Sequence, residues 1–159
     1  MGVTPFHLEC RVGRLVELRP EGLRSVGDLS AIFSAIGQLR RAAPGPAIFC
    51  VDWRLLRVLS PDVAELLANS MREGNTHTLR SAALMGQRAM LGLQLDRVIR
   101  ESNHPSRRIF RDPAAMLAWL GEVTTPEEQA RATDFIASIE LPGSEPPLSR
   151  LPARARPGS

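Results

Sequence analysis

A short apolar run that ends at an acidic residue constrains the fold of this chain most. The run consists of Ala47, Ile48, Phe49, Cys50 and Val51. Five residues are too few for a helix, and an unbroken run of this length is typical of a strand covered on both faces of a parallel sheet. We therefore expect this strand in the middle of the sheet. Asp52 follows at its end, where open α/β sheets place their binding crevices.

The segment after this strand carries the start signal of a helix. Ser60 is suited to accept a hydrogen bond from an unpaired backbone N–H, Pro61 is suited to the first helical position, and Asp62 complements the positive end of the helix. We expect the helix to run from Pro61 to about Glu73. Gly74-Asn75 then predicts a left-handed helix end. A functional surface is expected at the start of this helix.

The remaining patterns complete an α/β fold. They predict an N-terminal hairpin over 6–12 and 14–19, a helix capped by Ser25 or Asp28, strands over 78–86 and 107–110, and helices over 88–101, after Asp112-Pro113 and after Thr125. The predicted order is ββαβαβαβα with an extra C-terminal helix, around a mixed, mostly parallel sheet. Residues 1–140 form one domain in this interpretation, and the Pro- and Arg-rich tail 141–159 is expected to be disordered.

The absence of lysine excludes several kinds of chemistry. All 20 basic residues are arginine, whereas phosphate-binding P-loops, Schiff-base enzymes and phosphoacceptor receiver domains use a lysine at a fixed place. Glycine-rich dinucleotide motifs, His-Glu-x-x-His, Cys-x-x-Cys and Gly-x-Ser-x-Gly are also missing from the sequence. Of the net charge of +3, the tail carries +2, so residues 1–140 are nearly neutral. The sequence shows no basic stripe along one helix, the usual sign of a nucleic-acid partner, so none is predicted.

The apolar segments predict a cytoplasmic protein without a membrane partner. None approaches the roughly 18–20 residues that cross a bilayer, and the first residues do not read as a secretory signal. In that compartment, Cys10 and Cys50 are expected to be free thiols.

Two sequence features resemble the STAS domain, the family named for sulfate transporters and anti-sigma-factor antagonists. One is the strand that ends in Asp52, followed by a turn and the Ser-capped helix, and the other is the ending RRIFRDPAAMLAWL. The resemblance covers about Phe6 to Gly121. It implies a STAS-like fold and a non-enzymatic protein that binds regulatory partners, such as kinase-like anti-sigma factors, through the surface around the helix after the third strand.

The resemblance also bears on Ser60. In phospho-regulated members, a Ser or Thr follows an Asp at that helix start, and a phosphate there breaks the partner contact. Counting from Asp52 places Ser60 at the Asp of the motif and Pro61 at the phosphoacceptor, whereas a shift of one residue makes Ser60 the acceptor. Ser60 is therefore either a helix cap alone or a phosphosite. The candidate partner-binding residues are Asp52, Trp53, Arg54, Ser60, Asp62 and Glu65.

Other residues are open to two interpretations. Trp53 and the residues after it form either an exposed rim that contacts a partner or a lid over the core. Arg107 and Arg108 precede an apolar strand and are interpreted as guards of a sheet edge. The three histidines, 7, 77 and 104, lie far apart in the sequence and are interpreted as scattered surface residues. No metal, cofactor or catalytic residue is predicted.

Three functions follow from these patterns. A protein-interaction module of a bacterial regulatory or signalling system is favoured. The alternative is a small-molecule or lipid-binding protein on the same scaffold, with the apolar stripe Met90, Leu91, Leu93 and Leu95 lining a pocket. A hydrolase is poorly supported because the sequence shows no pairing of a nucleophile with a base.

Overall fold

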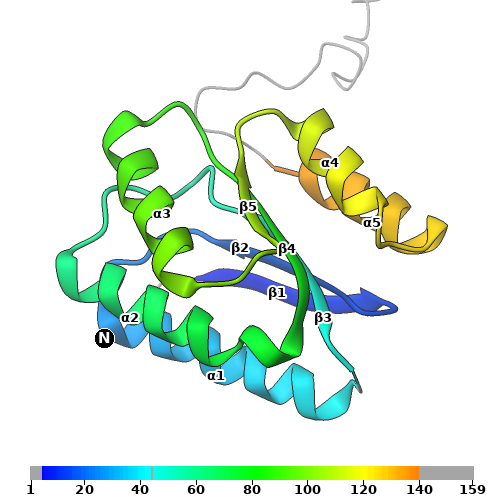
Figure 1. Ribbon diagram of the computed structural model, residues 1–159, viewed down its shortest axis with the longest axis horizontal. Coiled ribbons are helices and arrows are strands. Elements are labelled where there is room, and N and C mark those ends of the chain that lie inside the picture. The colour runs from blue at the N-terminus through cyan, green and yellow to red at the C-terminus, as the bar shows by residue number, and fades with distance from the viewer. Residues whose placement is uncertain (1–4, 44, 140–159) are drawn as a thin grey trace, which may run out of the picture.

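The computed structural model of the protein describes residues 5–43 and 45–139. A five-stranded sheet in the order β1-β2-β3-β4-β5 forms its centre (Figure 1). The strands are β1 (Phe6–Val12), β2 (Leu15–Pro20), β3 (Ala47–Asp52), β4 (Thr78–Leu84) and β5 (Arg107–Phe110). The helices are α1 (Val26–Ala42), α2 (Pro61–Glu73), α3 (Ala89–Ser102), α4 (Pro113–Gly121) and α5 (Pro126–Ala137), with a short 3-10 turn η1 (Asn75–His77) before β4. The predicted tail, 141–159, lies outside the described residues.

The predicted hairpin is confirmed at the N-terminus. β1 pairs antiparallel with β2, and Val12 lies opposite Leu15 across the two-residue turn Gly13-Arg14. Gly13 has a φ of +54°, in the left-handed region that favours glycine. A Cβ atom at Gly13 would also lie 2.6 Å from Oε2 of Glu128, the carboxylate that accepts a hydrogen bond from the Arg14 N–H at 2.8 Å. The turn is therefore fixed by α5 as well as by its own sequence.

The predicted central strand is also confirmed. β2, β3, β4 and β5 are mutually parallel, and β3 is the third of the five strands. Ile48 and Cys50 belong to the apolar core on one face of the sheet, and Val51 to the core on the other. This two-sided burial explains why the run has no polar alternation.

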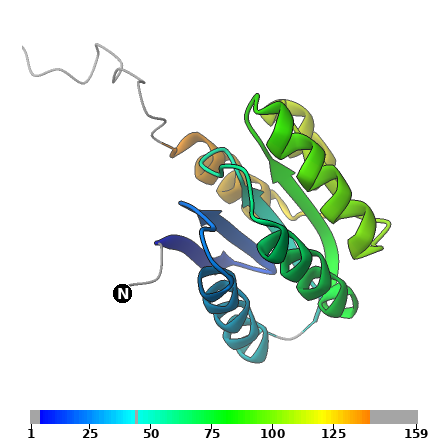
Figure 2. The same cartoon turned by 90° about the vertical axis from the view of Figure 1, so that its left-hand side faces the viewer.

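Two helical layers cover the sheet. Helices α1, α2 and α3 lie side by side on one face, and α4 and α5 cover the other (Figures 1 and 2). The first layer buries Leu29, Ile32, Val63, Leu67 and Leu95 against the sheet, and the second buries Met116, Leu120, Ala132, Phe135 and Ile136. The second layer exists because the chain continues past β5 with two further helices, the apolar α4 and the amphipathic α5.

Most predicted helix signals are confirmed, and the two that are wrong are both at ends of α2: the cap by Ser60 and the left-handed end at Gly74. The side chains of Ser25, Asp112 and Thr125 accept hydrogen bonds from the first-turn N–H groups of α1, α4 and α5, and Thr125 forms a full capping box with Glu128. The left-handed end predicted at Gly74 is wrong, because Gly74 is right-handed (φ −83°, ψ 0°). The chain there continues into η1 and does not reverse.

The order of elements is ββαβαβαβα followed by an additional helix, and the sheet is mixed and mostly parallel, as predicted. Within the described residues, no helix combines the length and apolarity needed to cross a membrane.

Candidate functional site at the end of β3 and the start of α2

Asp52 lies at the carboxyl end of β3 and is fully buried. Its carboxylate accepts hydrogen bonds from Nε of Arg19 at 2.8 Å, and from Nε and Nη2 of Arg54 at 2.9 and 3.0 Å. The backbone N–H of Arg54 donates a fourth, at 3.0 Å. Both arginine side chains are largely covered, with 13% and 15% exposure. Asp52 therefore pairs with two arginines inside the protein and has little capacity left for an external ligand.

The same arginines reach the last turn of α5. Nη2 of Arg19 donates to the carbonyl oxygen of Phe135 at 2.6 Å, and Nη2 of Arg54 donates to that of Ile136 at 2.7 Å. The Arg19 guanidinium also lies over the Phe135 ring, 4.3 Å from its centroid. Carbonyl groups at a helix C-terminus attract cations. The cluster therefore fastens α5 to the ends of two strands.

Trp53 resolves one of the alternatives left open by the sequence. Its side chain is 5% exposed and belongs to the core beneath α1 and α2, together with Leu56 and Leu59. The interpretation of this segment as a lid over the core is therefore correct, and the exposed rim is wrong. Trp53, Leu56 and Leu59 turn inward in this segment, whereas Val58 faces outward.

The six candidate partner-binding residues are thus divided between core and surface. Asp52 and Trp53 are buried and Arg54 is mostly covered, so these three position the segment between β3 and α2. Ser60, Asp62 and Glu65 are exposed at the start of α2. Only this second group lies where a partner has direct access.

Ser60 occupies the N-cap position of α2, but it does not make the predicted capping bond. Its hydroxyl donates instead to the carboxylate of Asp62, a stronger acceptor two residues away. The same Asp62 oxygen accepts the Val63 N–H at 3.0 Å. The hydrogen bond from Ser60, followed by that from Val63, holds the pKa of Asp62 below its ordinary value. The Ser60 side chain therefore remains exposed, beside a negative charge.

Gln94 joins the segment before α2 to helix α3. Its Oε1 accepts the Leu59 N–H at 2.9 Å, and its Nε2 donates to the Leu59 carbonyl at 2.8 Å. The neighbouring residues Val58, Met90 and Leu93 are 57%, 66% and 69% exposed. Of the stripe predicted to line a pocket, Leu91 and Leu95 are buried in the core and Met90 and Leu93 face outward.

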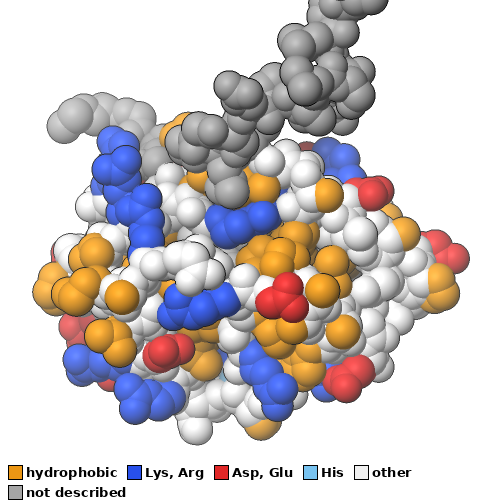
Figure 3. Space-filling view, turned by 90° about the horizontal axis from the view of Figure 1, so that it is seen from above, with side chains coloured by type: hydrophobic (Ala, Val, Ile, Leu, Met, Phe, Trp, Pro, Cys, Tyr) orange, Lys and Arg blue, Asp and Glu red, His pale blue; other side chains and the backbone are white. Residues whose placement is uncertain are grey.

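We name this region the α2–α3 surface; its residues are Val58, Ser60, Asp62, Glu65, Met90 and Leu93. It holds three of the four large hydrophobic side chains that are exposed among the described residues, the fourth being Val26 at the start of α1. On the side that includes the β4–α3 and β5–α4 connections, arginine and hydrophobic side chains are interspersed (Figure 3). The sequence predicted the part of the α2–α3 surface at the start of α2. It did not predict the exposure of Met90 and Leu93, because that depends on how α3 is rotated against the sheet.

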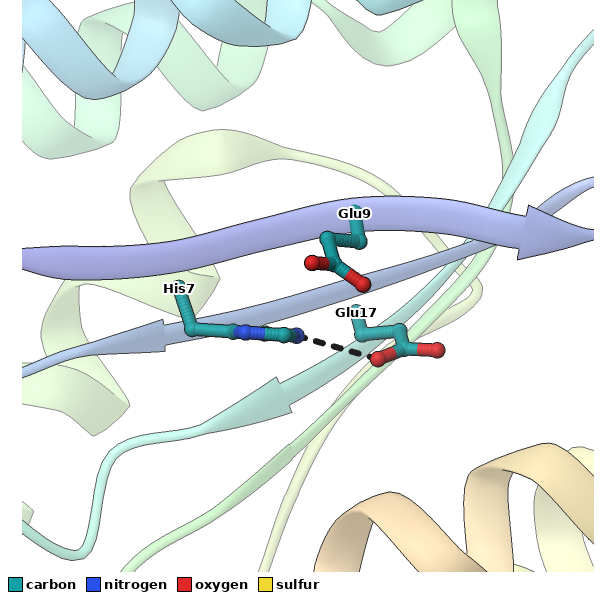
Figure 4. A group of neighbouring side chains, drawn as sticks. All are labelled: His7, Glu9 and Glu17. Carbon is teal, nitrogen blue, oxygen red and sulfur yellow. Dashed lines mark hydrogen bonds and ion pairs between the residues drawn. The ribbon is translucent and has the colours of Figure 1, made fainter.

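The structure brings His7, Glu9 and Glu17 together in the hairpin (Figure 4). Their ligand atoms lie within 4.8 Å of one another, a spacing compatible with a metal ion. The sequence offered no sign of this cluster, because the residues are adjacent only across the β1–β2 pairing. His7 and His104 are half-buried and hydrogen-bonded, so the prediction of scattered surface histidines holds only for the exposed His77.

The carboxylates of this cluster are already engaged. Glu17 is fully buried, and its Oε1 accepts hydrogen bonds from Nη2 of Arg131 at 2.8 Å and from Nε2 of His7 at 3.0 Å. Its Oε2 accepts from Nε of Arg131, and Glu9 pairs with Arg11. Burial alone would raise the pKa of Glu17, but the hydrogen bonds from Arg131 and His7 offset it and hold the pKa below its ordinary value. The cluster is best explained as an ion-pair network that joins the hairpin to α5.

No family model, curated protein or solved structure matches this chain. The STAS resemblance therefore rests on the residues and the element order described above, and its functional implications are proposals.

Proposed function

We propose that the protein is a non-enzymatic interaction module of a bacterial regulatory or signalling system, and that its partner binds the α2–α3 surface. The observation that carries this proposal is the grouping of exposed apolar side chains there. Val58, Met90 and Leu93 are each more than half exposed, and the hydrogen bonds between Leu59 and Gln94 join the segment that carries Val58 and Ser60 to the helix that carries Met90 and Leu93. Exposed apolar groups rimmed by polar residues are typical of protein–protein contact sites.

The surface is supported from beneath by rigid elements. The Asp52 cluster and the buried Trp53 hold the segment that precedes α2, and Gln94 joins it to α3 by two hydrogen bonds. A surface supported in this way loses little conformational entropy when a partner binds. This arrangement favours a binding function over one that requires a mobile loop.

The resemblance to STAS domains supports a regulatory partner, such as a kinase-like anti-sigma factor. It also supports Ser60 as a phosphosite, since the hydroxyl is exposed at the start of the expected helix. A phosphate on Ser60 would add nearly two negative charges beside Asp62, whose carboxylate already accepts the Ser60 hydroxyl. Repulsion would displace one of the two groups and change the surface that the partner contacts.

The test is site-specific photo-crosslinking in cells of the native organism. A benzophenone side chain is introduced at Leu93, and in a second variant at Val26, the exposed apolar residue outside the α2–α3 surface. The proposal predicts a discrete crosslinked protein from position 93 that is absent from position 26. Equal crosslinking from both positions, or none from position 93, would contradict it.

A further inference from the structure

A cavity of about 270 Å³ lies between helices α1 and α2 and the sheet. Its walls are mostly apolar and come from α1, α2 and strands β2 to β4; Ile32, Ile36, Phe49, Val51 and Leu67 are examples. Protein interiors seldom leave voids larger than a water molecule. A cavity of this size is in the range of small-ligand pockets, which are mostly apolar with a few polar groups.

The exposed residues of the lining show where the cavity opens. They are Arg14, Arg40, Gly45, Glu73 and His77. All five lie at the amino-terminal edge of the parallel strands, in the β1–β2 turn, at the end of α1, before β3 and around the end of α2. The opposite end is closed by the buried side chains of Leu18, Leu23 and Trp53. The α2–α3 surface is at the other edge of the sheet, so the cavity is a separate feature.

Arg107 lines this cavity from β5, which is an edge strand, but its interpretation as a guard of that edge is wrong because the side chain is buried. The residue is only 8% exposed. Its Nη2 donates to the carbonyl oxygen of Met71 and to Oδ1 of Asn75, both at 2.9 Å, while its Nε is buried and has no hydrogen-bond partner. No ion pair joins Arg107 to a carboxylate within the described part of the chain. Arg108, by contrast, is exposed and stacks over Trp119.

A buried guanidinium without a counter-charge is unfavourable. Burial lowers the pKa of Arg107 to about 10, which leaves the side chain charged at neutral pH. Ser81, which is paired with Arg107 in the β4–β5 register, also lines the cavity. An anionic group between these two residues would supply the missing charge and an acceptor for the unpaired N–H.

We propose that this cavity binds a single-chain amphiphile with a carboxylate head, of about eight or nine carbons, whose head lies at Arg107 and Ser81 and whose chain extends toward Leu18 and Trp53. The length follows from volume. An apolar cavity of about 150 Å³ holds benzene, which has six heavy atoms, so 270 Å³ holds about eleven by proportion. Octanoate has ten heavy atoms and is the probe of choice.

The test compares octanoate with 1-octanol, which has the same chain length and no charge, by titration calorimetry on the full chain. The wild type is expected to bind octanoate about ten-fold or more tightly than octanol, since hydrogen bonds to charged groups contribute about 1.5–3 kcal/mol. Arg107→Met should abolish this preference. Arg108→Met makes the same chemical change at the adjacent exposed residue and should leave it intact.

A second variant keeps the proposal testable if Arg107→Met does not fold. Ser70 lines the cavity from α2, and Ser70→Phe fills part of it while leaving Arg107 in place. This variant should lose binding of both octanoate and octanol, with an unchanged circular dichroism spectrum. The proposal is overturned if the folded wild type binds neither probe, if octanoate has no advantage over octanol, or if the preference survives in Arg107→Met or binding survives in Ser70→Phe.

Discussion

The buried carboxylate of Asp52 gives the sharpest stability prediction. Asp52→Asn keeps the size of the side chain but removes the negative charge that Arg19 and Arg54 share. Each arginine is at most 15% exposed, so neither is well solvated when the pair is broken. The new amide N–H group would also face arginine donors where an acceptor is needed.

The magnitude follows from the geometry. Removing one partner of a buried ion pair costs about 3–5 kcal/mol. The lower end applies here, because both arginines keep their bonds to the carbonyl groups of Phe135 and Ile136 at the end of α5. We expect the free energy of unfolding to fall by about 3 kcal/mol, a large share of the 5–15 kcal/mol typical of a domain. The melting temperature should fall by about 6–12 °C for a chain of this length.

Urea denaturation followed by tryptophan fluorescence measures this loss, since Trp53 is buried next to Asp52. Asp96→Asn is the matched control, because it removes the same charge from an exposed position on α3 and should change stability by less than about 0.5 kcal/mol. A double-mutant cycle with Arg19→Gln should show that this change costs less when Asp52 is already replaced. A loss below about 1 kcal/mol for Asp52→Asn would refute the reasoning.

Three further predictions test local features. Thr125→Ala should cost about 1 kcal/mol because it removes a capping bond, whereas Ser60→Ala should cost less than about 0.5 kcal/mol because Ser60 makes none; equal losses in urea denaturation would contradict this. Glu17→Gln should lower the free energy of unfolding at pH 7. The pKa of Glu17 is lowered in the folded state, so its contribution to stability is present above its ordinary pKa of 4.5 and is lost as the pH falls through the folded-state pKa. The difference in stability between the wild type and Glu17→Gln should therefore shrink in acid and not at high pH. Burial raises the pKa of Cys50 to about 12, so iodoacetamide should modify Cys10 alone in the native protein and both thiols in urea, as counted by intact mass.

Local signals explain why much of the fold could be predicted. The Gly13-Arg14 turn, the apolar run before Asp52 and the capping box at Thr125 each act within a few residues, and each occurs where the sequence indicated. Two local signals fail: Ser60 bonds to Asp62 and does not cap α2, and after Gly74 the chain continues into η1, where Arg107 bonds to Asn75, a contact that no local pattern contains.

The candidate site was harder to predict because its contacts join distant segments. The partners of Asp52 include an arginine 33 residues earlier, and the two arginines bond to the end of α5, more than 80 residues later. Trp53 has the same sequence signature as an exposed interface residue, and only the packing of α1 and α2 shows that it is buried. The cavity and the unpaired Arg107 Nε depend on how α1, α2 and the sheet pack together, which the periodicity of a single element does not indicate.

The most direct test of the central claim is quantitative affinity capture from a lysate of the native organism, comparing the wild type with Ser60→Asp, Asp62→Arg and the control Val26→Asp. The intact mass of the endogenous protein is recorded alongside, to detect phosphorylation. The account predicts one partner that is retained by the wild type and by Val26→Asp and is lost from both variants at the start of α2. A partner captured equally by all four proteins would contradict the placement of the binding site on the α2–α3 surface.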